Sequence, residues 1–133
     1  MDRDIYSGRA KLHGEESERT LRAAYNYATS LCDLERFEEA KSLLRRSIPV
    51  AHRVFGETDD TTLRMRTNYA GALIGADGAT LDDLREAVMT LEDVVRIARR
   101  VLGGSHPLTA QFEEALRRSR AALGARDTPS TSG

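Results

Sequence analysis

Hydrophobic residues recur every three or four positions along most of this chain, in stretches separated by polar or glycine-rich turns. Between 17 and 33, for example, the recurring residues are Leu21, Ala24, Ala28 and Leu31. Because an α-helix has 3.6 residues per turn, this spacing puts one apolar stripe on each helix. The pattern predicts an all-α fold of about six antiparallel helices without strands, over residues 2–13, 17–33, 36–55, 60–74, 81–102 and 106–124.

Residues with strong preferences at helix ends support these boundaries. Gly14 is a plausible C-terminal stop for the first helix. Thr80, with Asp83 three residues later, predicts a cap at the start of the fifth helix, and Ser105 is the expected N-cap of the sixth. Pro49 lies inside the third helix, where its missing N–H predicts a kink.

The chain also contains an internal repeat. Residues 14–33 and 56–75 are identical at nine of twenty positions, and 38–56 match 85–103 at seven of nineteen. A third copy starts at Gly103. We therefore divide the chain as follows: a second-half helix of an incomplete leading repeat at 1–13, repeat one at 14–55, repeat two with a longer internal turn at 56–102, a half repeat or capping helix at 103–124, and a disordered tail at 125–133.

Two motifs connect the repeat to a known family. The first helix contains Ala-x-x-Tyr-Ala-x-x-Leu from Ala24, and the second contains Glu-Ala-x-x-x-Leu from Glu39, which resembles a tetratricopeptide repeat. The 42-residue period, Gly-x-x-His-Pro-x-Thr at 103–109 and Thr-Leu-x-x-x-x-Asn-x-Ala in both copies resemble the kinesin light chain type of this repeat. The resemblance covers about 14–123 and implies a short α-solenoid.

The same resemblance implies a binding groove. In such arrays the first helix of each repeat lines a concave surface, where asparagines bond the backbone of an extended peptide and arginines meet acidic groups. The residues expected there are Arg22, Tyr25, Asn26, Thr29, Arg64, Thr67, Asn68, Gly71 and Arg118. The alternative is that the asparagines bond neighbouring helices and the arginines are merely solvated.

Composition narrows the class of partner. The 133 residues are 40% hydrophobic and 31% charged, with a net charge of −1, so nothing draws the whole chain to nucleic acid or an anionic membrane. Acidic residues gather at helix starts and arginine pairs near helix ends, as helix dipoles alone would favour. A single cysteine, an acidic N-terminus and the lack of a long apolar run predict a soluble, cytoplasmic protein without a membrane span.

No group of residues predicts catalysis, a metal or a cofactor. His13, His52 and His106 lack the spacing of metal ligands, and Cys32 has no histidine near it in sequence. We expect a non-enzymatic module that binds a protein or an acidic peptide in its groove, without nucleic acid. The rival hypothesis is an assembly unit that forms homo-oligomers or docks into a larger complex through its terminal half repeats.

Overall fold

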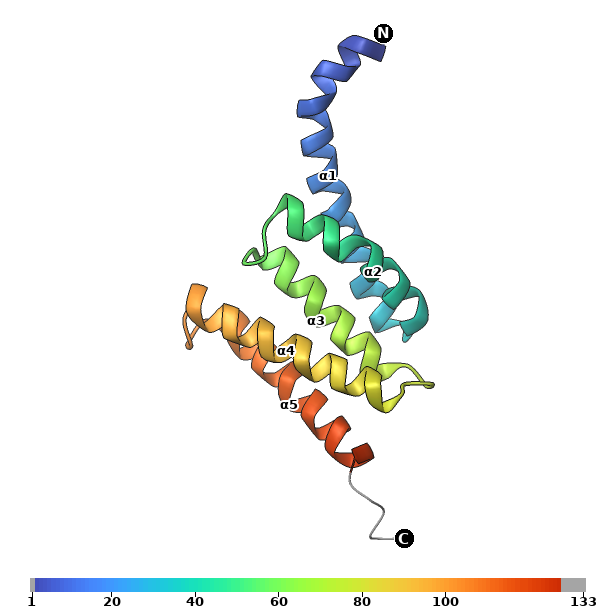
Figure 1. Ribbon diagram of the computed structural model, residues 1–133, viewed down its shortest axis with the longest axis vertical. Coiled ribbons are helices and arrows are strands. Elements are labelled where there is room, and N and C mark those ends of the chain that lie inside the picture. Colours follow the sequence, from blue (N-terminus) through green and yellow to red (C-terminus); the bar gives the residue numbers. More distant parts are fainter. Residues whose placement is uncertain (1, 128–133) are drawn as a thin grey trace.

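The computed structural model describes residues 2–127, with side chains over 18–126, and within this range the chain is all-α, as predicted (Figure 1). The described residues contain five helices and no strand. The helices are α1 (Asp2–Asp33), α2 (Phe37–Val54), α3 (Asp60–Gly75), α4 (Leu81–Val101) and α5 (Pro107–Asp127).

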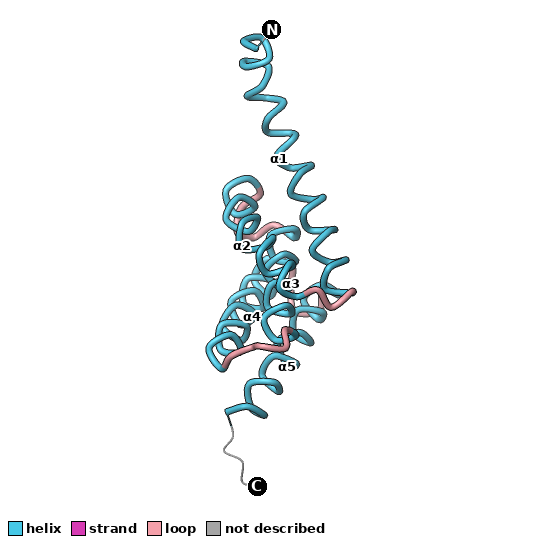
Figure 2. Tube along the Cα trace, turned by 90° about the vertical axis from the view of Figure 1, so that its right-hand side faces the viewer, coloured by secondary structure: helices cyan, strands magenta, loops and turns pink. Residues whose placement is uncertain are grey.

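The prediction of a separate helix over 2–13 is wrong, and with it the count of six. Helix α1 runs unbroken through Gly14, and its first half stands clear of the other helices (Figures 1 and 2). A glycine inside a helix costs only about 1 kcal/mol relative to alanine, and no proline accompanies this one. Gly14 therefore permits a turn without enforcing one.

The turns between helices use left-handed backbone at fixed places. Gly56, directly after the C-cap residue of α2, has φ 96°, and Gly103 has φ 98° at the same place after α4. Residues with a Cβ rarely adopt such values, which explains why glycine stands at both positions. Between α1 and α2 the chain turns at Glu35, with φ 61°.

Helix α2 contains Pro49 and continues past it to Val54. The proline ring removes the N–H that would bond the carbonyl of Arg45. The bend expected at this point stays a prediction.

The cap predicted for the second helix of repeat two is confirmed. Thr80 N–H donates to the Asp83 carboxylate at 2.9 Å, and Asp83 N–H donates to the Thr80 hydroxyl at 3.1 Å. The backbone hydrogen bond from Thr80, partly opposed by desolvation, lowers the pKa of Asp83.

The predicted boundaries of the last helix are wrong at both ends. Ser105 is not the N-cap, because Leu108 N–H donates to Nδ1 of His106 at 3.0 Å and Ala110 N–H donates to the His106 carbonyl. The imidazole satisfies a backbone donor that a hydroxyl was expected to satisfy. At the other end α5 continues past Gly124 to Asp127, and the remainder of the predicted tail, 128–133, lies outside the described residues.

The helices form two layers that pack against each other. Helix α3 packs against α1 on one side and α5 on the other, whereas α2 and α4 form the second layer, nearer the viewer in Figure 1. Small residues lie where the layers meet: Ala28, Ala40, Ala70 and Ala87 are all fully buried. The small size of these residues lets paired helices approach closely.

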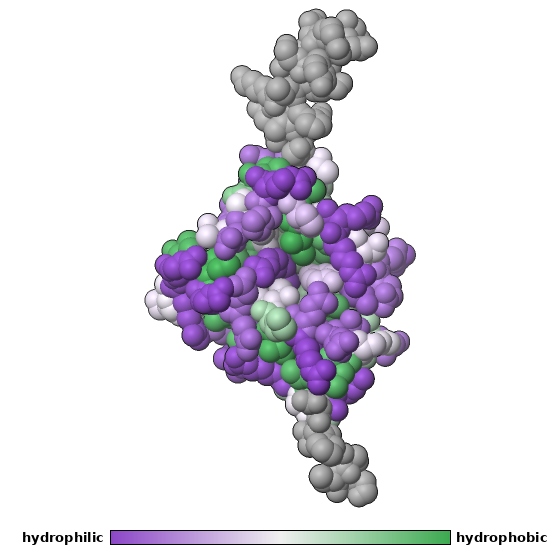
Figure 3. Space-filling view, viewed as in Figure 1, coloured by the Kyte–Doolittle hydropathy of each residue, from purple (hydrophilic) through white to green (hydrophobic). Residues whose placement is uncertain are grey.

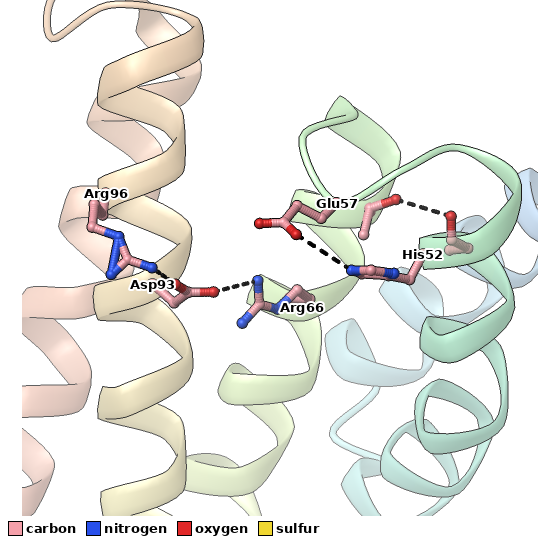
Figure 4. Close-up of polar contacts among 7 residues, drawn as sticks. His52, Glu57, Arg66, Asp93 and Arg96 are labelled. Atoms are coloured by element: carbon pink, nitrogen blue, oxygen red, sulfur yellow. Dashed lines mark hydrogen bonds and ion pairs between the residues drawn. The ribbon is translucent and has the colours of Figure 1, made fainter.

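Polar contacts link α3 to α4, and α2 to the turn that follows it. Arg66 of α3 bonds Asp93 of α4 at 2.9 Å, and Asp93 also pairs with Arg96, while His52 lies 3.6 Å from Glu57 (Figure 4). The face shown in Figure 3 is mostly hydrophilic, with small separate apolar areas.

Candidate functional site: a groove lined by α1, α3 and α5

Two adjoining hollows form a groove along the first layer of helices. One has a volume of about 560 Å³ and lies between α1, α3 and α5, and the other has a volume of about 380 Å³. Four residues line both hollows, so the two are continuous: Thr67, Asn68, Ala115 and Arg118. A groove of this kind can hold an extended segment rather than one compact ligand.

Asn68 lies at the centre of the groove and is partly engaged by the fold. Its side-chain amide donates to the Thr29 hydroxyl of α1 at 2.9 Å, and Thr29 in turn donates to the Tyr25 carbonyl at 3.0 Å. The thiol of Cys32 lies 3.8 Å from the Asn68 carbonyl. Among the described residues the side-chain oxygen of Asn68 has no partner, which leaves an acceptor for a ligand N–H.

Charged side chains gather at the larger hollow. Arg64 of α3 has no ion pair among the described residues, while Arg118 of α5 lies 3.7 Å from Glu114. Glu114 also pairs with Arg117 at 2.5 Å. The two arginines outnumber the one carboxylate in the lining, so this end of the groove favours an acidic ligand.

The smaller hollow is more apolar. Its walls include Phe37, Ile74 and Leu91, and the Phe37 ring lies against Gly75, where an added Cβ would come within 2.6 Å of it. An added Cβ at Gly71 would meet nothing within 4 Å, because that position faces open groove.

Two polar groups also border this smaller hollow. The hydroxyl of Ser119 is buried and has no hydrogen-bond partner among the described residues. Burial, and secondarily the charge of Asp33, raises the pKa of the Cys32 thiol. The thiol is therefore a poor nucleophile at neutral pH, and it serves here as part of the wall.

The structure places six of the nine sequence-predicted residues on the groove. These are Tyr25, Arg64, Thr67, Asn68, Gly71 and Arg118.

The other three predicted residues line neither hollow. Arg22 stacks over the Phe55 ring at 5.1 Å and lies 3.7 Å from Glu18. Asn26 is exposed on α1, and the Thr29 hydroxyl accepts a hydrogen bond from the Asn68 side-chain amide. The two Arg–Asn pairs of the repeat are therefore not equivalent in the fold.

The sequence analysis did not identify most of the groove residues from α5, or the apolar residues of the smaller hollow. Gln111 and Ala115 line the larger hollow at the places that the repeat alignment gives to Arg64 and Asn68, so the alignment could have identified them. Phe37 and Leu91 come from the second layer and reach the groove between first-layer helices. No sequence signal distinguishes them from ordinary core residues.

The described residues also bear on metal sites and membrane spans. Within the described range, no three histidine, cysteine or acidic side chains are placed to hold a metal ion together. None of the helices in that part of the chain is both long enough and apolar enough to cross a membrane.

Comparison with known proteins agrees with the repeat seen in sequence and structure. The family profile described as tetratricopeptide repeat matches residues 20–60 and 79–108, which together are just over half of the 133 residues. Searches of curated proteins and of solved structures found no match. The paired helices, the buried alanines at their crossings and this profile match lead to one conclusion: the chain belongs to the tetratricopeptide repeat family.

Proposed function

We propose that this protein is a non-enzymatic binding module that holds an extended peptide of a partner protein in the groove between α1, α3 and α5. Repeats of this family generally mediate interactions between proteins. The observation that carries the proposal is the continuity of the two hollows past Asn68, whose side-chain oxygen has no hydrogen-bond partner among the described residues.

The chemistry of the lining favours an acidic peptide. An extended backbone offers an N–H to the Asn68 oxygen whatever its side chains are. Arg64, which has no ion pair among the described residues, offers a planar fork to a carboxylate. Arg118 adds a second positive charge from the opposite wall.

We further propose that the repeat is of the kinesin light chain type and that the protein acts in the cytoplasm. The 42-residue spacing of the two complete copies and the Gly-x-x-His-Pro-x-Thr sequence at 103–109 support the repeat type. The structural part played by His106, whose imidazole caps α5, gives that motif a physical reason.

The experiment is a selection of binding peptides followed by charge reversal. A displayed library of random 12-residue peptides would be selected on the full chain, and one recovered peptide would be titrated by fluorescence anisotropy. Arg64→Glu should weaken its binding at least tenfold, equivalent to about 1.4 kcal/mol. Arg46→Glu is the matched control, because Arg46 is also exposed and without an ion pair among the described residues, but it lies on α2 outside the groove. Equal losses in both variants would contradict the groove.

A second candidate function, self-association, is favoured by one observation. Tyr27 and Leu34 of α1 remain 55% and 66% exposed although they are large and apolar or aromatic. These residues lie on a face of α1 that lines neither hollow.

A further inference from the structure

Another hollow lies between α4 and α5, and it shares no lining residue with the groove. Its volume is about 460 Å³. Val95 and Leu116 form an apolar floor and are 4% and 7% exposed. The rest of the lining is charged and consists of one carboxylate and four exposed arginines: Glu92, Arg96, Arg99, Arg100 and Arg120. A hollow with this lining is suited to an anion.

Two ion pairs between the helices bracket the hollow. Arg99 of α4 bonds Glu113 of α5 at 2.6 Å, and Arg120 of α5 bonds Glu92 of α4 at 3.2 Å. In this antiparallel register an apolar residue of α5 stands opposite Arg96, midway between the two pairs. The middle of the hollow therefore contains Arg96 without a carboxylate facing it from the other helix.

Positive charge at this hollow exceeds the negative charge that is paired with it. Arg96 pairs with Asp93 of its own helix, but Asp93 also bonds Arg66 of α3 (Figure 4). Arg100 has no ion pair among the described residues. The cluster as a whole contains five arginines and three carboxylates, an excess of two positive charges: Arg66, Arg96, Arg99, Arg100 and Arg120 against Glu92, Asp93 and Glu113.

Neither the repeat nor the helix dipole explains this concentration of arginine. When each helix is aligned with its counterpart in the preceding copy, only Arg100 of the four lining arginines has an arginine counterpart, Arg53. The dipole of α4 favours basic residues in its last turn, which accounts for Arg99 and Arg100. Arg96 and Arg120 lie further inside their helices, so their positions need another reason.

One compact anion with two negative charges matches this arrangement. A phosphate monoester carries about −1.5 to −2 charges at neutral pH and offers three acceptor oxygens, whereas a carboxylate carries a single charge. Arginine binds phosphate through two parallel hydrogen bonds. A nucleic-acid backbone needs a continuous basic stripe over several phosphates, but here Glu92 and Glu113 interrupt the arginines on both sides. Because repeats of this family generally mediate interactions between proteins, a phosphorylated side chain of a partner protein is the source that agrees with the fold.

We propose that the hollow between α4 and α5 is a second binding site, which takes one phosphorylated serine or threonine side chain of a partner protein. Arg96 and Arg100 bind the phosphate oxygens, while Arg99 and Arg120 keep their carboxylate partners and form the two ends of the site. The site shares no residue with the groove, so the proposal stands independently of peptide binding there.

A matched pair of peptides tests the requirement for phosphate. A short glycine–alanine peptide with one central phosphoserine, and the same peptide with unmodified serine, would each be titrated at low ionic strength into the ¹⁵N-labelled full chain. We expect saturable amide shifts around 96–100 and 116–120 with the phosphopeptide only, and weaker binding as salt is added. Equal shifts with both peptides, or no shift at millimolar phosphopeptide, would overturn the proposal.

Neutral variants locate the site. The double variant Arg96→Gln, Arg100→Gln should weaken phosphopeptide binding by roughly tenfold or more. Its melting temperature should stay nearly unchanged, because the one ion pair that it removes is exposed. Arg46→Gln is the matched control, since Arg46 is an exposed arginine without an ion pair among the described residues and lies on α2. Equal losses in the double variant and the control would refute the site.

Vesicles distinguish a phosphorylated protein from a phosphorylated lipid. The full chain would be sedimented with phosphatidylcholine vesicles that contain or lack a phosphoinositide. We expect it to stay in the supernatant with both. Sedimentation with the phosphoinositide vesicles, together with no binding of the phosphopeptide, would assign the hollow to a lipid headgroup and overturn the proposal.

Discussion

Asn68 and Asn26 occupy the same position in two copies of the repeat, yet the structure predicts unequal costs for removing them. Asn68→Ala deletes the amide that donates to the Thr29 hydroxyl at 2.9 Å in a half-buried contact between α3 and α1. A hydrogen bond of this kind contributes about 0.5–1.5 kcal/mol net to folding. Asn26 is exposed and has no hydrogen bond among the described residues, so Asn26→Ala should change stability by less than about 0.5 kcal/mol.

These numbers convert to melting temperatures that a calorimeter resolves. For a domain of this size about 1 kcal/mol corresponds to roughly 3–5 °C. Asn68→Ala should therefore melt a few degrees below wild type, and Asn26→Ala should be indistinguishable from it. Urea denaturation would show the same order in midpoint with an unchanged slope.

Comparing Asn68→Ala with Asn26→Ala also shows whether each asparagine stabilises the fold, binds peptide, or does both. Asn68→Ala should weaken peptide binding as well as stability, whereas Asn26→Ala should alter neither. The double variant should retain its helical spectrum and bind peptide as weakly as Asn68→Ala does. Equal melting temperatures for the two single variants would refute the assigned hydrogen bond, and a double variant that unfolds would assign both residues to packing.

Three further predictions concern the fold around the groove. Gly71→Ala should raise stability by about 0.4–1 kcal/mol, because its Cβ would enter open groove, whereas Gly75→Ala should lower it by about 1–2 kcal/mol through contact with the Phe37 ring. Thermal melts of this glycine pair check both signs. Ala70→Leu should cost about 1–3 kcal/mol by overpacking a fully buried helix crossing. An unchanged melting temperature would mean that this face of α3 does not pack against its neighbours. Thr80→Ala should cost about 1 kcal/mol in urea denaturation, because the Asp83 N–H loses the hydroxyl that accepts from it.

The pH dependence of that cap follows from the Asp83 carboxylate. Its pKa is lowered in the folded state, chiefly by the Thr80 N–H that donates to it. A group with a lowered folded pKa contributes stability above its unfolded pKa and loses that contribution as pH falls through the folded value. Acidification should therefore reduce the difference in stability between wild type and Asp83→Ala, the variant that removes this carboxylate.

The sequence predicted those elements whose boundaries depend on local chemistry. The Thr80–Asp83 cap and the burial of Ala28 and Ala70 all follow from spacing and residue size. Gly14 shows the limit of such reasoning. The same residue type ends α2 and α4 with a left-handed φ, but continues α1, because tertiary contacts and not glycine itself decide whether the chain turns.

The groove was predictable only as far as the repeats are equivalent. Asn68 and Asn26 are followed by the same two residues, Tyr and Ala, yet only Asn68 is flanked by first-layer helices on both sides. Arg22 also differs from its counterpart Arg64, since it lies over the Phe55 ring and lines neither hollow. Position in the stack, which a single repeat does not encode, determines which copies of a residue reach the groove.

Chemical-shift mapping would test the peptide groove most directly. The ¹⁵N-labelled full chain would be titrated with the library-selected peptide, and backbone amide shifts would be followed residue by residue. We predict that the largest changes lie on the facing sides of α1, α3 and α5, around Tyr25, Asn68, Gly71 and Ala115. Changes confined to the outer side of α2 and α4, around Arg46 and Met89, would contradict peptide binding in the groove.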